Sequence, residues 1–95
     1  MSIDQKTFNG ILHAAMRAHD VDPEGSGGVA FEKMPLIARD VRREIDQIGA
    51  TEAELHEYFD WFRPEICDQS MTQAGRNMAM LELAKGFGLR ISLPS

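Results

Sequence analysis

The stretch DPEGSGGVAFEKM, residues 22–34, separates two segments of helical periodicity and so decides how the chain is organised. It holds Pro23 and three glycines, which together make the strongest loop signal in the sequence. On both sides of it, apolar residues recur at spacings of three and four. They are Phe8, Ile11, Leu12, Ala15 and Ala18 before the stretch, and Ile37, Val41, Ile45 and Ile48 after it. The sequence therefore predicts a helix–loop–helix unit around residues 22–34.

Capping signals extend this unit to four helices. We expect them over residues 3–20, from Pro35 to Ile48, from Thr51 to just before Pro64, and from the SMTQ stretch at 70–73 to near Gly86. Two capping boxes, Ser2 with Gln5 and Thr51 with Glu54, mark the starts of the first and third helices. Gly49 is placed to end the second helix.

The last residues of the chain change period from 3.6 to 2. Apolar Phe87, Leu89, Ile91 and Leu93 alternate with small or polar residues, which is typical of a short strand. A partner strand is expected either within the chain, around Val29, or in another protein. The predicted fold is mainly α, a small four-helix domain spanning residues 1–95 with a short C-terminal strand.

The composition is that of a globular protein with an acidic balance. At 95 residues, 43% hydrophobic and 26% charged, the chain is sized for one modest core. It has no apolar run of the ~20 residues that span a membrane and no signal-peptide pattern, so we expect a cytoplasmic protein without membrane contact. The net charge of −5 disfavours direct binding to nucleic acid. Residues 1–60 carry the acidic excess, with 6 Lys and Arg against 12 Asp and Glu.

The 22–34 stretch also presents oxygen-bearing groups at alternate positions. With Asp22 at position 1, Glu24 and Ser26 fall at positions 3 and 5, a glycine at position 6 and the Gly28 carbonyl at position 7. In this spacing the stretch resembles the EF-hand loop of the calmodulin and troponin C family, and the likeness covers roughly residues 14–41. The resemblance implies an EF-hand-like helix–loop–helix in which Asp22, Glu24, Ser26 and Gly28 are calcium ligands.

Two residues depart from the family pattern. Lys33 occupies position 12, where the family has a bidentate glutamate. A unit-charge pair at ~4 Å is worth about 4 kcal/mol at an effective dielectric near 20, so this ammonium weakens or abolishes calcium binding. Pro35 falls inside the family's exiting helix and is expected here to begin the helix instead. The alternative interpretation is a glycine-rich connection that matches the pattern by chance; no other cofactor is expected.

Other candidate chemistry rests on small sets of residues. Glu52, His56 and Asp60 share one helix face and offer zinc ligands, or else form an exposed, salt-linked face. Cys67 could pair with a distant histidine as a nucleophile and base, but a small buried thiol is the commoner use of such a residue. No convergent set of titratable groups is apparent, so an enzyme is not expected.

The aromatic stretch YFDWF at 58–62 is the most distinctive local feature for recognition. Trp61 falls on its more polar side and is a candidate interface anchor. We assign partner binding to Trp61 together with the strand residues Phe87, Leu89 and Ile91. The expected function is a small protein-interaction module, with a protein partner or a second copy in a homodimer. The alternative is a small phage- or plasmid-type regulator or inhibitor of nucleic-acid machinery that binds a protein target.

Overall fold

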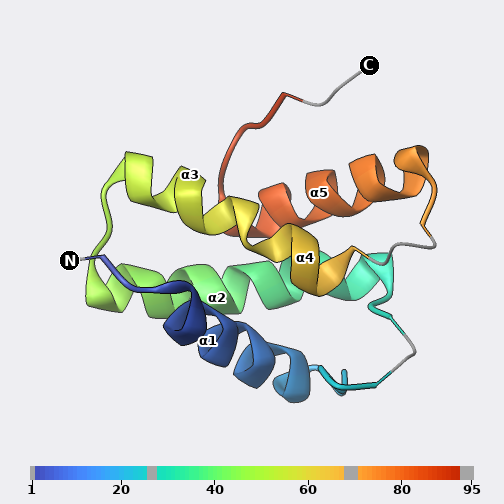
Figure 1. Ribbon diagram of the computed structural model, residues 1–95, viewed down its shortest axis with the longest axis horizontal. Coiled ribbons are helices and arrows are strands. Elements are labelled where there is room, and N and C mark those ends of the chain that lie inside the picture. The colour runs from blue at the N-terminus through green and yellow to red at the C-terminus, as the bar shows by residue number, and fades with distance from the viewer. Residues whose placement is uncertain (1, 26–27, 68–70, 93–95) are drawn as a thin grey trace.

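The computed structural model describes residues 2–25, 28–67 and 71–92, and in these residues the chain is mainly helical (Figure 1). The elements are α1 (Gln5–Ala18), the 3₁₀ turn η1 (Phe31–Lys33), α2 (Met34–Ile48), α3 (Glu52–Asp60), α4 (Phe62–Ile66) and α5 (Gln73–Phe87). The predicted mainly α fold is confirmed. Helices α1, α2, α3 and α5 correspond to the four expected helices, and α4 is an additional short one.

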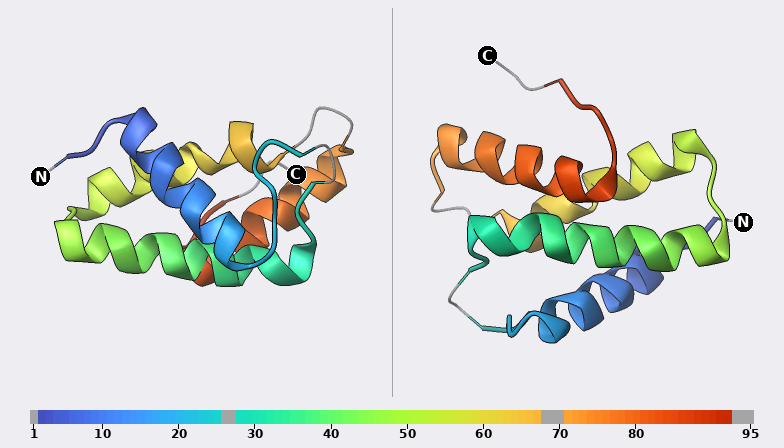
Figure 2. Two further views of the ribbon diagram at one scale, coloured as in Figure 1. Left: turned by 90° about the horizontal axis from the view of Figure 1, so that it is seen from below. Right: turned by 180° about the vertical axis from the view of Figure 1, so that it is seen from behind.

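Helix α2 lies at the back of the molecule in the view of Figure 1. Seen from behind, in the right view of Figure 2, it has α1 on one side and α5 on the other. Helices α3 and α4 cross in front of this layer and close the core from the opposite side (Figure 1). The residues after α5 leave the body of the molecule beside α3. As a result α5 touches α2 along one side and approaches α4 along the other.

The buried apolar side chains form a single cluster to which all the α-helices contribute. Phe62 is at its centre: its ring lies 5.2 Å from that of Phe8, 5.7 Å from Phe59 and 5.4 Å from Phe87, measured between centroids, with edge-to-face geometry in each pair. Such pairs stabilise a core beyond the area they bury. No polar or charged residue is fully buried among the described residues, so the cluster is held by apolar packing.

The helix ends follow the capping signals with one correction. The Thr51 hydroxyl accepts from the Glu54 amide at 3.1 Å and the Glu54 carboxylate accepts from the Thr51 amide at 2.9 Å, which confirms this capping box. Gly49, at φ 94°, ends α2. The first helix is capped by Asp4 and not by Ser2, because the Asp4 carboxylate accepts from the Thr7 amide at 2.8 Å.

The third expected helix ends at Asp60, before Pro64, but a further short helix that was not expected follows it. The chain breaks at Trp61, whose amide bonds to the Tyr58 carbonyl, and resumes as α4, in which Pro64 is the third residue. A proline in the first turn removes an amide that has no intrahelical acceptor there, so it does not disrupt the helix. The proline is therefore compatible with a second short helix in place of a loop.

The predicted C-terminal strand is wrong. Helix α5 continues through Phe87 and ends at Gly88, which adopts the left-handed conformation at φ 77°. No strand is present in the described residues, and 88–92 have no regular structure; Leu93 lies outside the described residues. The alternation is too short to outweigh the burial of Phe87 in the core. Phe31, close to the proposed partner strand at Val29, begins a 3₁₀ turn.

Candidate functional site

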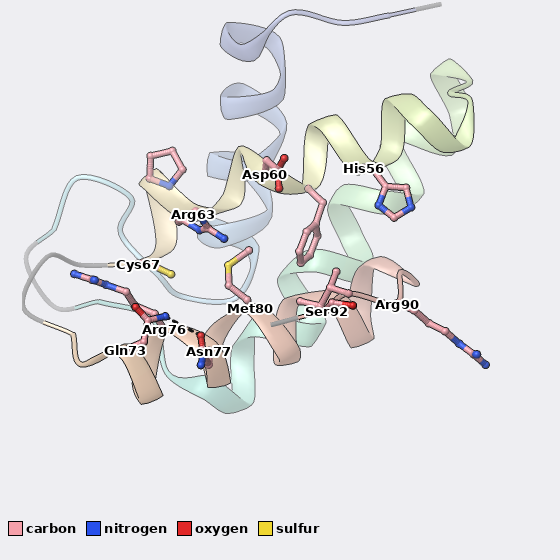
Figure 3. A pocket seen from close by; sticks show the side chains of 13 residues that line it. His56, Asp60, Arg63, Cys67, Gln73, Arg76, Asn77, Met80, Arg90 and Ser92 are labelled. Atoms are coloured by element: carbon pink, nitrogen blue, oxygen red, sulfur yellow. Dashed lines mark hydrogen bonds between the residues drawn. The ribbon is translucent and has the colours of Figure 1, made fainter. Parts of the chain in front are cut away.

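A groove of about 730 Å³ lies between α3–α4, α5 and residues 90–92 (Figure 3). We call it the arginine groove, because each of its three walls carries one arginine. The α3–α4 wall contributes Arg63, the α5 wall contributes Arg76, and the residues after α5 contribute Arg90. Phe59 and Met80, which are 3% and 4% exposed, form its apolar floor.

The balance of charge in the arginine groove is positive, in contrast to the net charge of −5 of the chain. Among the described lining residues, the three arginines are opposed by a single carboxylate, that of Asp60. Arg63 points into the groove, whereas Arg90 extends from its rim into solvent (Figure 3). Neither Arg63 nor Arg90 forms an ion pair with a residue that the structure describes. Their guanidinium groups are therefore available to a negatively charged ligand.

Cys67 is half-buried in the wall of the arginine groove at the end of α4. Burial raises the pKa of its thiol, and the positive charges of Arg63 and Arg76 offset part of that rise. A raised pKa keeps the sulfur protonated and poorly nucleophilic at neutral pH. His56 lines the same groove but lies at its opposite end (Figure 3).

The other two histidines contact carboxylates of other residues. His13 in α1 lies 3.2 Å from the Glu65 carboxylate of α4, and His19, at the end of α1, lies 2.8 Å from the Asp40 carboxylate of α2. The structure thus does not bring a histidine to Cys67 in the way that the nucleophile hypothesis requires.

The proposed zinc ligands lie on the exposed face of α3. His56 and Asp60 line the arginine groove, whereas Glu52 is not among the lining residues. Within residues 2–25, 28–67 and 71–92, no group of three or more His, Cys, Asp or Glu side chains is placed to hold a metal ion. Two of the three proposed ligands, His56 and Asp60, are therefore part of the groove.

The loop between α1 and η1 holds the residues that resemble an EF-hand. The Asp22 carboxylate accepts from the Glu24 amide at 3.0 Å, and Glu24 is exposed. Gly28 has a φ of 66°, a conformation that favours glycine. Ser26 lies outside the described residues. The assignment of this loop to calcium binding stays a prediction.

Of the residues assigned to partner binding, one lines the arginine groove. Ile91 is half-buried in its wall, and Leu89 is half-buried against the core. Trp61 is half-buried, with its ring 5.6 Å from that of Phe8 and 5.2 Å from that of Tyr58. Phe87 is fully buried, so a partner cannot reach it while the core is intact. The three groove arginines were not predicted, because only the fold brings them together.

Comparison with known protein families, with curated proteins and with solved structures finds no significant match to this chain. No residue role can therefore be transferred from a relative. In the described residues, no helix is both long enough and apolar enough to cross a membrane. The arginine groove is a feature of the described residues that combines charge with an apolar surface.

Proposed function

We propose that this protein is a small, non-enzymatic interaction module that binds a segment of a partner protein in the arginine groove. The observation that carries the proposal is the groove itself, which combines an apolar floor with a charged, open rim. Binding sites on proteins commonly have this layout, because buried apolar contacts supply affinity and a few polar groups fix orientation.

The packing around the groove supports this use. Phe59 and Met80 line the hollow, although only 3% and 4% of their surface is exposed. A ligand side chain entering there would contact the half-buried Ile91 and the small part of Phe59 and Met80 that stays exposed. Methionine is flexible and polarizable, so Met80 can adapt to different ligand shapes. A module of this size gains stability from such a partner.

Calcium has no required part in this proposal. The residues of the EF-hand-like loop lie between α1 and α2, whereas the groove is formed by α3, α4, α5 and the C-terminal residues. Lys33 also places a positive charge at the position where the family has its strongest ligand. We therefore propose that calcium binding at this loop is weak or absent and that it is separate from partner binding.

Site-specific photo-crosslinking in cells tests the proposed function. One variant carries a photoreactive amino acid at Ser92 on the rim of the groove, and its matched control carries it at Arg39, an exposed position of α2 outside the groove. We expect the Ser92 probe to capture a partner that the Arg39 probe does not. Equal capture from both positions, or none from either, would contradict the proposal.

A further inference from the structure

We infer that the arginine groove selects an acidic protein segment that carries at least one large apolar side chain. This inference rests on the proposed function and specifies the chemistry of the ligand. It is argued from two features of the groove, the positive charge of the rim and the apolar character of the floor.

The rim offers positive charge from more than one direction. Arg63 points into the groove from α4 and Arg90 extends from its rim into solvent, so a segment lying in the groove would contact Arg63 and could reach Arg90 where it leaves (Figure 3). Guanidinium groups bind carboxylates through two parallel hydrogen bonds, which fixes orientation as well as affinity. Asp60, the one carboxylate among the described lining residues, would repel an acidic ligand near α3 only. An acidic segment therefore complements most of the rim.

Outside the groove, three cations form ion pairs, whereas Lys6, Arg17, Lys33 and Arg39 form none with a described residue. Arg42 pairs with Asp46 at 2.9 Å, Arg43 with Asp40 at 3.3 Å, and Lys85 with Glu82 at 2.8 Å. Arg63 and Arg90 have no such carboxylate within the described residues. The groove thus keeps at least two guanidinium groups for a carboxylate that comes from outside.

The floor and the side of the groove offer a small apolar area to the ligand. Phe59 and Met80 lie at the base of the groove and the half-buried Ile91 at its side. A purely acidic ligand would leave this surface exposed to water, whereas an aromatic or aliphatic side chain of the ligand would cover it. Buried anchors of this kind surrounded by polar contacts carry most of the affinity in protein interfaces.

A nucleic acid is the less suitable polyanion for this site. Its phosphates extend well beyond a single groove, and affinity depends on many cations along their path. Outside residues 61–95 the chain holds 6 Lys and Arg against 12 Asp and Glu, so an extended phosphate backbone would meet repulsion. A short acidic segment satisfies the groove without crossing the acidic half.

Selection from a library of random displayed peptides tests the inference with the whole chain as bait. We expect enrichment of peptides that combine Asp or Glu with an aromatic or aliphatic residue. The affinity of an enriched peptide should fall about tenfold in Arg63→Glu and further in the double variant with Arg90→Glu. The matched control is Arg39→Glu, an exposed arginine outside the groove, which should keep affinity within about twofold. Circular dichroism of each variant verifies that the fold is intact.

The outcomes separate the inference from the proposed function. Enriched peptides that are neutral or basic, yet lose affinity in a groove variant such as Asn77→Arg, would overturn the acidic preference and leave the interaction module in place. Enrichment that no groove substitution reduces, or no enrichment, would overturn both. Tighter binding of single-stranded DNA than of the enriched peptides, lost in Arg63→Glu, would overturn the inference in favour of a nucleic-acid ligand.

Discussion

The two long sides of α5 differ in how much space they leave. Toward α2, Gly86 lies so close to Pro35 that a Cβ there would overlap the Pro35 carbonyl oxygen. Toward α3 and α4, Arg76 and Met80 line a groove of about 730 Å³. One side has no room for a methyl group, while the other can hold several side chains of a ligand. The first side stabilises the fold, and we propose that the second binds a partner.

The arginines on the two sides show the same difference. Arg42, on the α2 side, donates to the Phe87 carbonyl and lies 5.7 Å from the centre of the Phe87 ring. It also pairs with Asp46, so its donors are used within the chain. Arg63, in the groove, has no ion pair with a described residue. Substitutions on the two sides should therefore affect different properties.

The largest effect is expected from Gly86→Ala. Because the new Cβ would meet backbone atoms of Pro35, α2 and α5 must separate, at a cost of about 3 kcal/mol in the free energy of unfolding. Gly10→Ala in α1 is the matched control, since a Cβ there meets nothing within 4 Å; it should stabilise the helix by up to about 1 kcal/mol. Urea denaturation measures both, and equal stabilities for the two variants would show that the α2–α5 contact is looser than described.

A smaller loss is expected from Arg42→Ala. This change removes the hydrogen bond to the Phe87 carbonyl and the contact with the Phe87 ring, at a cost of about 1 to 2 kcal/mol. Arg43→Ala is the control, because Arg43 is exposed and its pair with Asp40 is worth less than about 1 kcal/mol. Thermal unfolding of the two variants should rank them in this order, and the reverse ranking would contradict the role given to Arg42.

On the groove side, the expected effect is on the reactivity of the Cys67 thiol. Since burial raises the pKa of its thiol, alkylation by iodoacetamide at pH 8 should be slower in the folded protein than in urea, and should accelerate as pH rises. Arg63→Glu removes a positive charge that lowers this pKa, so it should slow the reaction further. Mass spectrometry follows the rate; faster alkylation in the folded protein would mean that the thiolate is favoured in the groove.

The smallest effect is expected from calcium. With Lys33 at position 12, we expect a dissociation constant no tighter than about 1 mM, so calcium should leave the melting temperature nearly unchanged. Lys33→Glu should strengthen binding if the loop has EF-hand geometry. Titration calorimetry of both forms decides the point: a micromolar constant for the natural sequence would refute the prediction, and no gain in the variant would favour the chance match.

Local sequence signals predicted the helices better than they predicted the surface. The Thr51 capping box and Gly49 depend on neighbouring residues only, and the structure confirms both. The break at Trp61 and the burial of Phe87 depend on packing around Phe62, which no local spacing encodes. Apolar alternation after Gly86 therefore indicated a strand, whereas Phe87 belongs to the helix and residues 88–92 have no regular structure.

The candidate site was even harder to predict from the sequence than the helices were. Its arginines come from α4, from α5 and from the residues after α5. They are therefore far apart in the sequence. In sequence Arg63, Arg76 and Arg90 look like three scattered surface cations. Only the crossing of α5 behind α3 and α4 places them around one groove.

Nuclear magnetic resonance with the labelled protein tests the central claim, that the open side of α5 is the binding surface. The probe is the tightest peptide from the library selection, added to the natural sequence. We predict that amide shifts change in residues 56–67, 73–80 and 88–92 and saturate together, while those of α1 and of the α2 residues away from α5 stay constant. Shifts centred on α1 or on the outer face of α2, with the groove residues unchanged, would contradict the account.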